Sequence, residues 1–481
     1  MTDKISNGVK TFDLIIIGGG AGAFAAAIRA NEISSASGGK IKTAMINAGL
    51  PLGGTCVNVG CLPSKILLHA GEVLHAAKHH NIPGIEIEVK NFDFNRVIKD
   101  ELIMVDMSRR DHYDKVLEHL EHVTFIEGRA MFVSKHEIEV NGKKLAAKKF
   151  IIATGSTANV PPIEGIRETG YVTHIEALKL TRQPKELIVV GAGPVGLEFA
   201  QMYARFGTKV TVLEFGQTIF RPGEPELMAK LRKIMEDEGI TIFTNAKVIK
   251  ASRKDDKKIV TYEHDGKTGE ISADEILLAV GKTPNTKDLA LEKSGIKIDK
   301  RKAIIVNKFF RTNKAHIFAV GDVSNAPLRL ETTAGHEGTL ASKNALGGTK
   351  DSIDYDTVPY AIFTDPQFAS VGWTEARQVK ETGTCACRTV PFTVIPKAQV
   401  IRRTEGLIKM SIDPKTKRIL GIHILAPNAS DLIAQAATLI KNKNTIDDVI
   451  HSTPVFPTLS EAIKYAALAF VKDISKLSCC I

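Results

Sequence analysis

The chain has 481 residues, of which 43% are hydrophobic and 25% are charged, so its composition excludes wholesale disorder and low-complexity architecture. Its length predicts about three domains. The net charge of +10 comes from basic residues scattered among acidic ones, which indicates a cationic surface suited to phosphate-bearing ligands and not a nucleic-acid-binding protein.

The N-terminal twenty residues lead through a short apolar stretch into glycines and resemble neither a signal peptide nor a transit sequence. No run of about 18 apolar residues is present, so we expect a cytoplasmic protein that does not cross a membrane. Six cysteines are too few for a disulfide framework and indicate redox or metal chemistry. They fall into three pairs: Cys56 with Cys61, Cys385 with Cys387, and Cys479 with Cys480.

Two strand, glycine turn and helix patterns occur in the chain. The first is the apolar run Phe12–Ile17, followed by glycines and an alanine-rich helix, and the second is the run Glu186–Val190, followed by glycines and a helix that includes Glu198–Arg205. Glycines let the backbone approach a pyrophosphate, whose charge then lies at the helix N-terminus. Two such patterns predict two bound dinucleotides, and therefore electron transfer between them.

Similar strand-to-glycine segments lie between and after these turns, at residues 150–155 and 276–281, and we expect the chain to cross there between two nucleotide-binding domains. A third segment, residues 317–322, ends in Asp322, which is suited to hold the sugar-like chain of a flavin or else is a turn residue. Residues 34–39 are predicted as a surface loop, and residues 253–267 as a charged hairpin.

From Tyr355 onward the pattern changes to an α+β domain. The predicted strands are residues 366–371, 388–395, 407–412 and 418–425, and the predicted helices are residues 431–443 and 460–471.

The most informative segment is GGTCVNVGCLPSK, residues 53–65. If it is helical from Thr55, then Cys56 and Cys61 lie on successive turns near the helix N-terminus, where the helix dipole and Lys65 favour the thiolate. Such a pair can form and break a disulfide. The alternative is two unrelated buried thiols.

This segment resembles the active-site stretch of the flavoprotein disulfide reductases, a family that includes glutathione reductase, dihydrolipoyl dehydrogenase and mercuric reductase. The resemblance covers almost the whole chain. It implies an α/β fold of two Rossmann-like dinucleotide-binding domains, as in glutathione reductase, with a C-terminal α+β dimerisation domain that completes each active site of a homodimer. The domains would be residues 1–160 and 288–354 for FAD, 161–287 for NAD(P)H, and 355–481 for the interface.

By this resemblance, Cys61 would be the thiolate stacked on the flavin and Cys56 the outer, exchanging thiol. Lys65 would lie near the reactive nitrogen of the flavin and pair with Glu198. The implied FAD-binding residues are Gly18, Gly20, Gly22, Ala23, Asn47, Gly54, Thr55, Lys65, Ala130, Thr154, Gly155 and Asp322. The implied NAD(P)H-binding residues are Gly191, Gly193, Gly196, Glu198, Glu214 and Gly281.

Two of these positions concern the riboses of the two nucleotides. Asn47 stands where the family usually has an acid that binds the adenosine ribose of FAD, and an amide can still hydrogen-bond a hydroxyl. Glu214 ends the strand at residues 210–213, and an acid at this position binds the ribose hydroxyl of NADH and repels the extra phosphate of NADPH. NADH is therefore the expected donor, with NADPH possible through Arg221.

The segment FPTLSE, residues 456–461, matches the stretch where disulfide reductases carry a histidine base followed by a glutamate that orients it. Phe456 occupies the histidine position, so the reduction of organic disulfides should be poor, because that reaction needs an acid to protonate the leaving thiol. His451 could substitute, or it is an ordinary surface or core histidine. Thr458 stands where many members have a tyrosine, and we assign it no role.

The tail ends in Cys479 and Cys480, and soft thiolates select soft ions such as Hg(II). The tail resembles that of mercuric reductases, here without the N-terminal metal-binding domain that many of them carry. We expect reduction of thiol-bound Hg(II) by NAD(P)H, with Cys479 and Cys480 of one subunit passing the ion to Cys56 and Cys61 of the other. The alternatives are a dihydrolipoamide or disulfide reductase and a non-catalytic soft-metal-binding flavoprotein. Cys385 and Cys387 are an auxiliary metal relay or incidental thiols.

Overall fold

The computed structural model describes residues 9–478 and divides into two compact units. The first unit comprises Met1–Pro63, Lys99–Asn159 and Gly281–Tyr355, and the second comprises Ser64–Ile98, Val160–Val280 and Asp356–Ile481. The tail cysteines Cys479 and Cys480 lie outside the described residues. Among residues 9–478, no helix is both long and apolar enough to cross a membrane.

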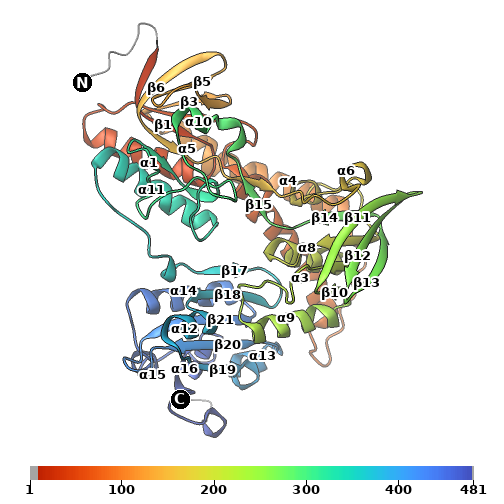
Figure 1. Cartoon of the computed structure of the whole chain (residues 1–481). Coiled ribbons are helices and arrows are strands. Elements are labelled where there is room, and N and C mark those ends of the chain that lie inside the picture. The colour runs from red at the N-terminus through yellow and green to blue at the C-terminus, as the bar shows by residue number, and fades with distance from the viewer. Residues whose placement is uncertain (1–8, 479–481) are drawn as a thin grey trace. The chain divides into compact units, whose positions relative to one another are not determined.

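The first unit is built on a seven-stranded sheet with strand order β3-β2-β1-β6-β5-β4 and with β16 added against β6 (Figure 1). Its strands are β1 (Lys10–Ile17), β2 (Thr43–Asn47), β3 (Val123–Glu127), β4 (Ala130–Phe132), β5 (Glu137–Val140), β6 (Lys143–Ile152) and β16 (Ile317–Ala319), with a separate pair of β7 (Ser156–Ala158) and β15 (Lys282–Pro284). Its helices are α1 (Ala21–Ala36), α2 (Gly54–Val59), α5 (Lys115–Glu118), α10 (Leu291–Ser294) and α11 (Glu331–Gly347). Two further helices, α3 (Cys61–His79) and α4 (Phe94–Arg109), continue from one unit into the other.

Side chains of β1 alternate between two hydrophobic cores, as the period of a strand requires. Leu14 and Ile16 pack with α1 and α11, whereas Ile15 and Ile17 pack on the opposite face of the sheet. Helix α1 is rich in alanine because it lies directly against α11 (Figure 1). A Cβ atom at Gly338 of α11 would come within 2.1 Å of the backbone of α1, so only glycine fits there.

In the second unit, a parallel sheet of order β10-β9-β8-β14 is covered by α8 on one face and by the antiparallel sheet β11-β12-β13 on the other. The strands are β8 (Glu186–Val190), β9 (Lys209–Leu213), β10 (Thr241–Phe243), β11 (Ala246–Lys254), β12 (Lys257–His264), β13 (Lys267–Ala273) and β14 (Glu275–Leu278). The helices are α6 (Ile166–Thr169), α7 (His174–Ala177), α8 (Pro194–Phe206) and α9 (Pro225–Asp237).

The C-terminal part of the second unit is a five-stranded antiparallel sheet of order β17-β18-β21-β20-β19, with α14 packed on β18 and β21. Its strands are β17 (Tyr360–Ile362), β18 (Gln367–Gly372), β19 (Ala386–Pro391), β20 (Leu407–Ile412) and β21 (Ile419–Ala426). Its helices are α12 (Glu375–Thr382), α13 (Pro396–Val400), α14 (Ala429–Lys441), α15 (Ile446–Ile450) and α16 (Glu461–Leu468).

Three local predictions have wrong bounds. The surface loop predicted at residues 34–39 begins only at Ser37, because α1 continues to Ala36 and Ser34 is fully buried, with its hydroxyl donating to Ile41 O at 2.8 Å. The strand predicted at residues 388–395 ends at Pro391, where a 3-10 turn follows. The last predicted helix ends at Leu468 and not at residue 471.

Candidate active site

The two cysteines of the GGTCVNVGCLPSK segment lie on two helices and not on one. Helix α2 carries Cys56 and ends at Val59, the backbone of Gly60 is not helical, and Cys61 is the first residue of α3. The start of α2 is fixed by Asn58, whose side-chain amide donates to the carbonyls of Leu52 at 3.0 Å and Gly54 at 2.8 Å. This side chain, which the sequence analysis passed over, holds the glycine loop against the helix that bears Cys56.

The sulfur atoms of Cys56 and Cys61 and a carboxylate oxygen of Glu331 all lie within 4.8 Å of one another. Neither cysteine is in a disulfide, and Cys56 is partly buried whereas Cys61 is exposed. The Cys56 thiol donates a hydrogen bond to Glu331 Oε2, and the Tyr113 hydroxyl donates to Glu331 Oε1 at 3.4 Å. The pair is therefore accessible and lies beside a carboxylate.

The expectation that the Cys56 thiol is readily ionised is wrong. Its hydrogen bond with Cys61, its burial and the neighbouring Glu331 carboxylate all raise the pKa of Cys56. A negative charge on either neighbour makes a second charge costly and so disfavours ionisation of Cys56.

The first glycine turn, after β1, has the tight backbone that a dinucleotide requires. Gly18 has a φ of +136°, and a Cβ atom there would lie 2.2 Å from the carbonyl oxygen of Ala153. The turn also contacts the start of α2, because Gly53 N donates to Gly19 O at 2.8 Å and a Cβ atom at Gly54 would lie 2.7 Å from Gly20 Cα. This side-chain-free cradle, which leads into α1, fits the pyrophosphate of FAD.

Three of the other expected FAD residues border the same sheet. Asn47 ends β2 beside Gly19, and its side-chain nitrogen donates to Leu50 O at 2.9 Å, so Asn47 Oδ1 is suited to accept from a ribose hydroxyl. Asp322 follows β16 and accepts from the Ser156 hydroxyl at 2.6 Å. Ala130 begins β4 and is buried.

The turn that carries Asp322 is held by a glutamate that the sequence analysis missed. Glu337 of α11 is fully buried and accepts from Gly321 N at 2.6 Å and from the Tyr355 hydroxyl at 2.7 Å. Burial raises the pKa of Glu337. The sequence offered one signal for this role, namely an acidic residue among the small residues of α11.

Thr154 and Gly155 follow β6, shortly before the chain leaves the first unit after Asn159, and they bond to the segment that re-enters this unit at Gly281. The Thr154 hydroxyl donates to Asn285 O at 2.9 Å, and Asn285 N donates to Gly155 O at 2.9 Å. Gly281 has a φ of +91° and accepts from Asn159 N at 2.9 Å. The two crossing segments are thus bonded to each other.

The second glycine turn, after β8, repeats this design. A Cβ atom at Gly196 would lie 1.9 Å from Gly191 O, so the helix α8 can start this close to the strand only with glycine. Gly193 is the extended residue directly before α8. Glu214 follows β9, and its two carboxylate oxygens accept from Ala192 N at 2.6 Å and from Gly216 N at 2.7 Å.

Lys65 and Glu198 form an ion pair within the second unit. Lys65 Nζ lies 2.7 Å from Glu198 Oε2, and it stands 4.4 Å above the ring of Phe363. The other oxygen of Glu198 accepts from Phe363 N at 2.9 Å. Glu198 is buried, and each of its oxygens has a partner. One oxygen fixes the Lys65 ammonium group, and the other fixes the backbone of the C-terminal domain at Phe363.

The segment at residues 456–461 contains no imidazole. Phe456 is 48% exposed, and the Glu461 carboxylate accepts from Thr458 N at 2.9 Å and so caps its own turn. His451 is exposed at the end of α15, with Nδ1 2.8 Å from Asp447 O, as expected for an ordinary surface histidine.

Cys385 and Cys387, at the start of β19, are joined in a disulfide within the structure. A carboxylate oxygen of Glu375 lies within 4.8 Å of both sulfur atoms. Alternate residues of a strand point to one face, which brings the two sulfurs together.

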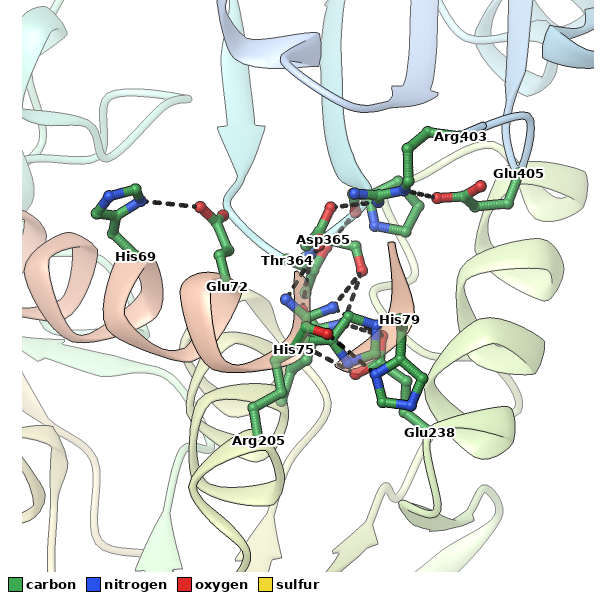
Figure 2. Close-up of polar contacts among 12 residues, drawn as sticks. His69, Glu72, His75, His79, Arg205, Glu238, Thr364, Asp365, Arg403 and Glu405 are labelled. Carbon is green, nitrogen blue, oxygen red and sulfur yellow. Dashed lines mark hydrogen bonds and ion pairs between the residues drawn. The ribbon is translucent and has the colours of Figure 1, made fainter. Parts of the chain in front are cut away.

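A second polar cluster, which no sequence motif indicated, lies around Arg205 of α8 (Figure 2). The Arg205 guanidinium forms two hydrogen bonds with Glu238, at 2.8 and 3.0 Å, and one with Asp365 Oδ2 at 3.0 Å. Asp365 Oδ1 also accepts from Arg403 at 2.6 Å. Burial alone would raise the pKa of Asp365, but Arg403 and Arg205 hold that pKa below its ordinary value.

His75 of α3 lies against this cluster, 4.0 Å from Glu238 Oε1 and stacked on His79 (Figure 2). Its burial and the Arg205 guanidinium lower the pKa of His75 to about 4. The cluster joins α3, α8 and the C-terminal domain within the second unit, and its cations and anions are paired with one another. It is therefore a structural element and not a reactive one.

Comparison with known proteins agrees with this geometry. The family model for pyridine nucleotide-disulphide oxidoreductases matches residues 12–362, and the model for the dimerisation domain of the same family matches residues 358–467. The chain belongs to the pyridine nucleotide-disulphide oxidoreductase family. It therefore has the α/β fold of that family, with FAD and NAD(P)H domains and a C-terminal dimerisation domain.

Within the family, the chain is similar to members with different substrates. It is 37% identical to a mercuric reductase of Streptomyces lividans, and the match covers 98% of each chain. It is 36% identical to a mercuric reductase of Bacillus cereus, over 98% of this chain and 73% of the relative. It is also 36% identical to the mitochondrial dihydrolipoyl dehydrogenase of Pisum sativum, over 96% of this chain and 91% of the relative. Identity alone therefore fixes the cofactor chemistry and not the substrate.

Among solved structures, the chain is similar to a Cu(II) complex of the HOCl-induced flavoprotein disulfide reductase RclA from Escherichia coli. The TM-score is 0.84 at 28% sequence identity, and the match covers 96% of this chain and 100% of the other.

Proposed function

We propose that this oxidoreductase is a mercuric reductase, which reduces thiol-bound Hg(II) to Hg(0) with two electrons from NAD(P)H. The observation that carries the proposal is the combination of an accessible pair of cysteines, Cys56 and Cys61, with Phe456 where disulfide reductases carry a histidine. Reduction of a bound metal ion needs no acid to protonate a leaving thiol, whereas reduction of an organic disulfide does.

The glycine cradle fits FAD, and the bound group would supply two-electron transfer between NAD(P)H and the cysteine pair. Gly18, Gly20, Gly22 and Ala23 would hold its pyrophosphate at the start of α1. Asn47 and Asp322 would bind its hydroxyl groups.

Lys65 would act at the flavin as a fixed positive charge. Glu198 and the ring of Phe363 hold its ammonium group from two sides, so it keeps one orientation. A cation held in this way can stabilise negative charge that develops on a neighbouring ring nitrogen, without the cost of reorganisation during the reaction.

Cys56 and Cys61 would bind the substrate ion. Hg(II) is soft and favours two sulfur ligands in a near-linear arrangement, which two thiolates supply without further donors. The proton on Cys56 leaves when the metal binds.

The terminal cysteines Cys479 and Cys480, outside the described residues, would capture Hg(II) from small thiols and pass it to the inner pair of the partner subunit by ligand exchange. This step requires a homodimer, which the presence of the dimerisation domain supports. A Cys479→Ala, Cys480→Ala double variant should then lose activity most strongly when strong thiol ligands compete for Hg(II).

NADH is the proposed donor, because Glu214 is held by Ala192 N and Gly216 N at the position where an acid meets the adenosine ribose. The exposed Arg221 keeps NADPH possible. We place the reaction in the cytoplasm, where both nicotinamide nucleotides and reduced thiols are available.

Oxidation of NADH and NADPH by the purified flavoprotein tests the proposal. Hg(II) with excess thiol, oxidised lipoamide and glutathione disulfide are compared as acceptors at equal concentration. The proposal predicts turnover that depends on Hg(II) and little with either disulfide. Turnover with lipoamide alone would identify a dihydrolipoamide reductase, and no turnover with any acceptor would leave a binding protein.

A further inference from the structure

Glu331 stands out beside the cysteine pair because the proposed reaction does not use it. It is the first residue of α11, 275 positions from Cys56 along the chain, and its exposed side chain turns toward the two sulfurs. One of its oxygens and the sulfurs of Cys56 and Cys61 lie within 4.8 Å of one another. Two soft donors and one hard donor therefore face a common point.

The carboxylate is held in this position from two sides. The Tyr113 hydroxyl donates to Glu331 Oε1 at 3.4 Å, and the Cys56 thiol donates to the other oxygen, Glu331 Oε2. The Tyr113 ring is itself fixed, since it packs edge-on against Phe24 at 4.9 Å. A negative charge in the first turn of a long helix is also favoured by the helix dipole.

We propose that Glu331 is a third, oxygen ligand of the metal ion held by Cys56 and Cys61. The ion would replace the proton that Cys56 now shares with Glu331 Oε2, so that two sulfurs and one oxygen surround it. The proposal rests on the proposed function in one respect, namely that the pair takes a metal ion as substrate.

The consequence concerns which ions the site accepts. Hg(II) is satisfied by two thiolates, so a carboxylate adds little to its binding. Zn(II) and ions of similar preference, such as Cd(II), take three or more ligands and accept carboxylate oxygen beside sulfur. Glu331 would therefore widen the site from the softest ions to divalent cations of intermediate softness.

Cd(II) is the probe, because it is much harder to reduce to the metal than Hg(II) is. The full-length flavoprotein is used in a background where Cys385, Cys387, Cys479 and Cys480 are replaced by serine, so that the inner pair provides the remaining thiols. After anaerobic reduction with a phosphine, Cd(II) is titrated and the ultraviolet cadmium–thiolate band is followed. Hg(II) affinity is measured in competition with a small thiol.

Glu331→Gln keeps the size of the side chain and removes its charge. It should weaken Cd(II) binding by at least about 10- to 100-fold, which is the loss typical when even an outer partner of a metal ligand is removed, while Hg(II) affinity changes less than about twofold. The absorbance per bound Cd(II) should be unchanged, because both thiolates remain. Glu331→Asp should recover part of the affinity. The control is Glu292→Gln, which removes an exposed glutamate from another first helical turn of the same unit and should change neither affinity.

Unchanged Cd(II) affinity in Glu331→Gln would overturn the proposal, as would an equal loss for Cd(II) and Hg(II), which would indicate a general disturbance of the pair. Cadmium-113 NMR gives a second measurement, because loss of an oxygen ligand must shift the resonance. The Cd(II) binding results test the ligand role of Glu331 separately from the proposed mercuric reductase activity. If Cd(II) binding depends on Glu331 but Hg(II) supports no turnover, the ligand assignment stands and the mercuric reductase does not.

Discussion

The polar cluster at Cys56 and the polar cluster at Arg205 differ in how completely their groups are paired. Arg205 is almost fully buried, and its cation meets the carboxylates of Glu238 and Asp365. Around Cys56, an exposed thiol, a partly buried thiol and an exposed carboxylate converge within 4.8 Å of one another. Completed pairing stabilises a fold, whereas converging donors that remain accessible can bind an ion.

The largest expected effect separates activity from stability at the cysteine pair. Cys61→Ala should lower NAD(P)H-dependent metal reduction by more than about 10³-fold, because electrons can no longer reach the bound ion through the pair. Flavin content and the free energy of unfolding should remain close to wild type, since the side chain is exposed. A loss of bound flavin in this variant would instead give Cys61 a structural role.

The reverse result is expected at the buried cluster. Arg205→Met should lower the free energy of unfolding by about 3–5 kcal/mol in urea, because it removes the cation that pairs with buried Glu238 and leaves Asp365 with Arg403 alone. The control is Arg29→Met, which breaks an exposed pair with Glu32 and should cost about 1 kcal/mol or less. Equal effects of the two substitutions would show that the Arg205 cluster contributes little.

His75 gives the buried cluster a pH dependence. Its pKa is about 4 in the folded protein and ordinarily 6.5, so folding favours the neutral ring. The contribution of the neutral His75 ring to the free energy of unfolding is fully present above pH 6.5. It is lost as the pH falls toward 4, by about 3 kcal/mol at most. His75→Gln should therefore lose less stability than wild type between pH 7 and pH 4.5 in urea titrations. Parallel curves for the two proteins would contradict the shift.

The smallest expected effect concerns nucleotide choice at the second glycine turn. Glu214→Ala should lower the ratio of kcat/KM for NADH to that for NADPH by about tenfold, since about 1.4 kcal/mol of discrimination is lost. Arg221→Ala should move the ratio in the opposite direction. An unchanged ratio in Glu214→Ala would remove this residue from the account of specificity.

Local patterns made much of the fold predictable. Each glycine turn is a short segment in which the strand, the glycines and the helix start follow one another, and Glu186–Val190 is a strand with the expected bounds. The family resemblance added the placement of the dimerisation domain. The break at Gly60 was not foreseen, although glycine is a weak helix former and Gly60 was a possible end for the first helix.

Contacts between distant parts of the chain were the ones that could not be predicted. Glu331 meets Cys56 across 275 positions, and nothing near Glu331 marks it as part of a site. Arg205 looked like an ordinary charged residue of a helix, and only the fold brings Asp365 to it. Burial of a charge depends on which elements meet, and a one-dimensional pattern does not contain that information.

The most direct test of the central claim is a mass balance of mercury against nicotinamide. The purified enzyme is supplied with NADH, excess thiol and a limiting amount of Hg(II), while volatile Hg(0) is swept out and trapped, with the Cys61→Ala protein as the control. The account predicts one Hg(0) released for each NADH oxidised, and none from the control. NADH oxidation without volatile mercury, or equal release from both proteins, would contradict it.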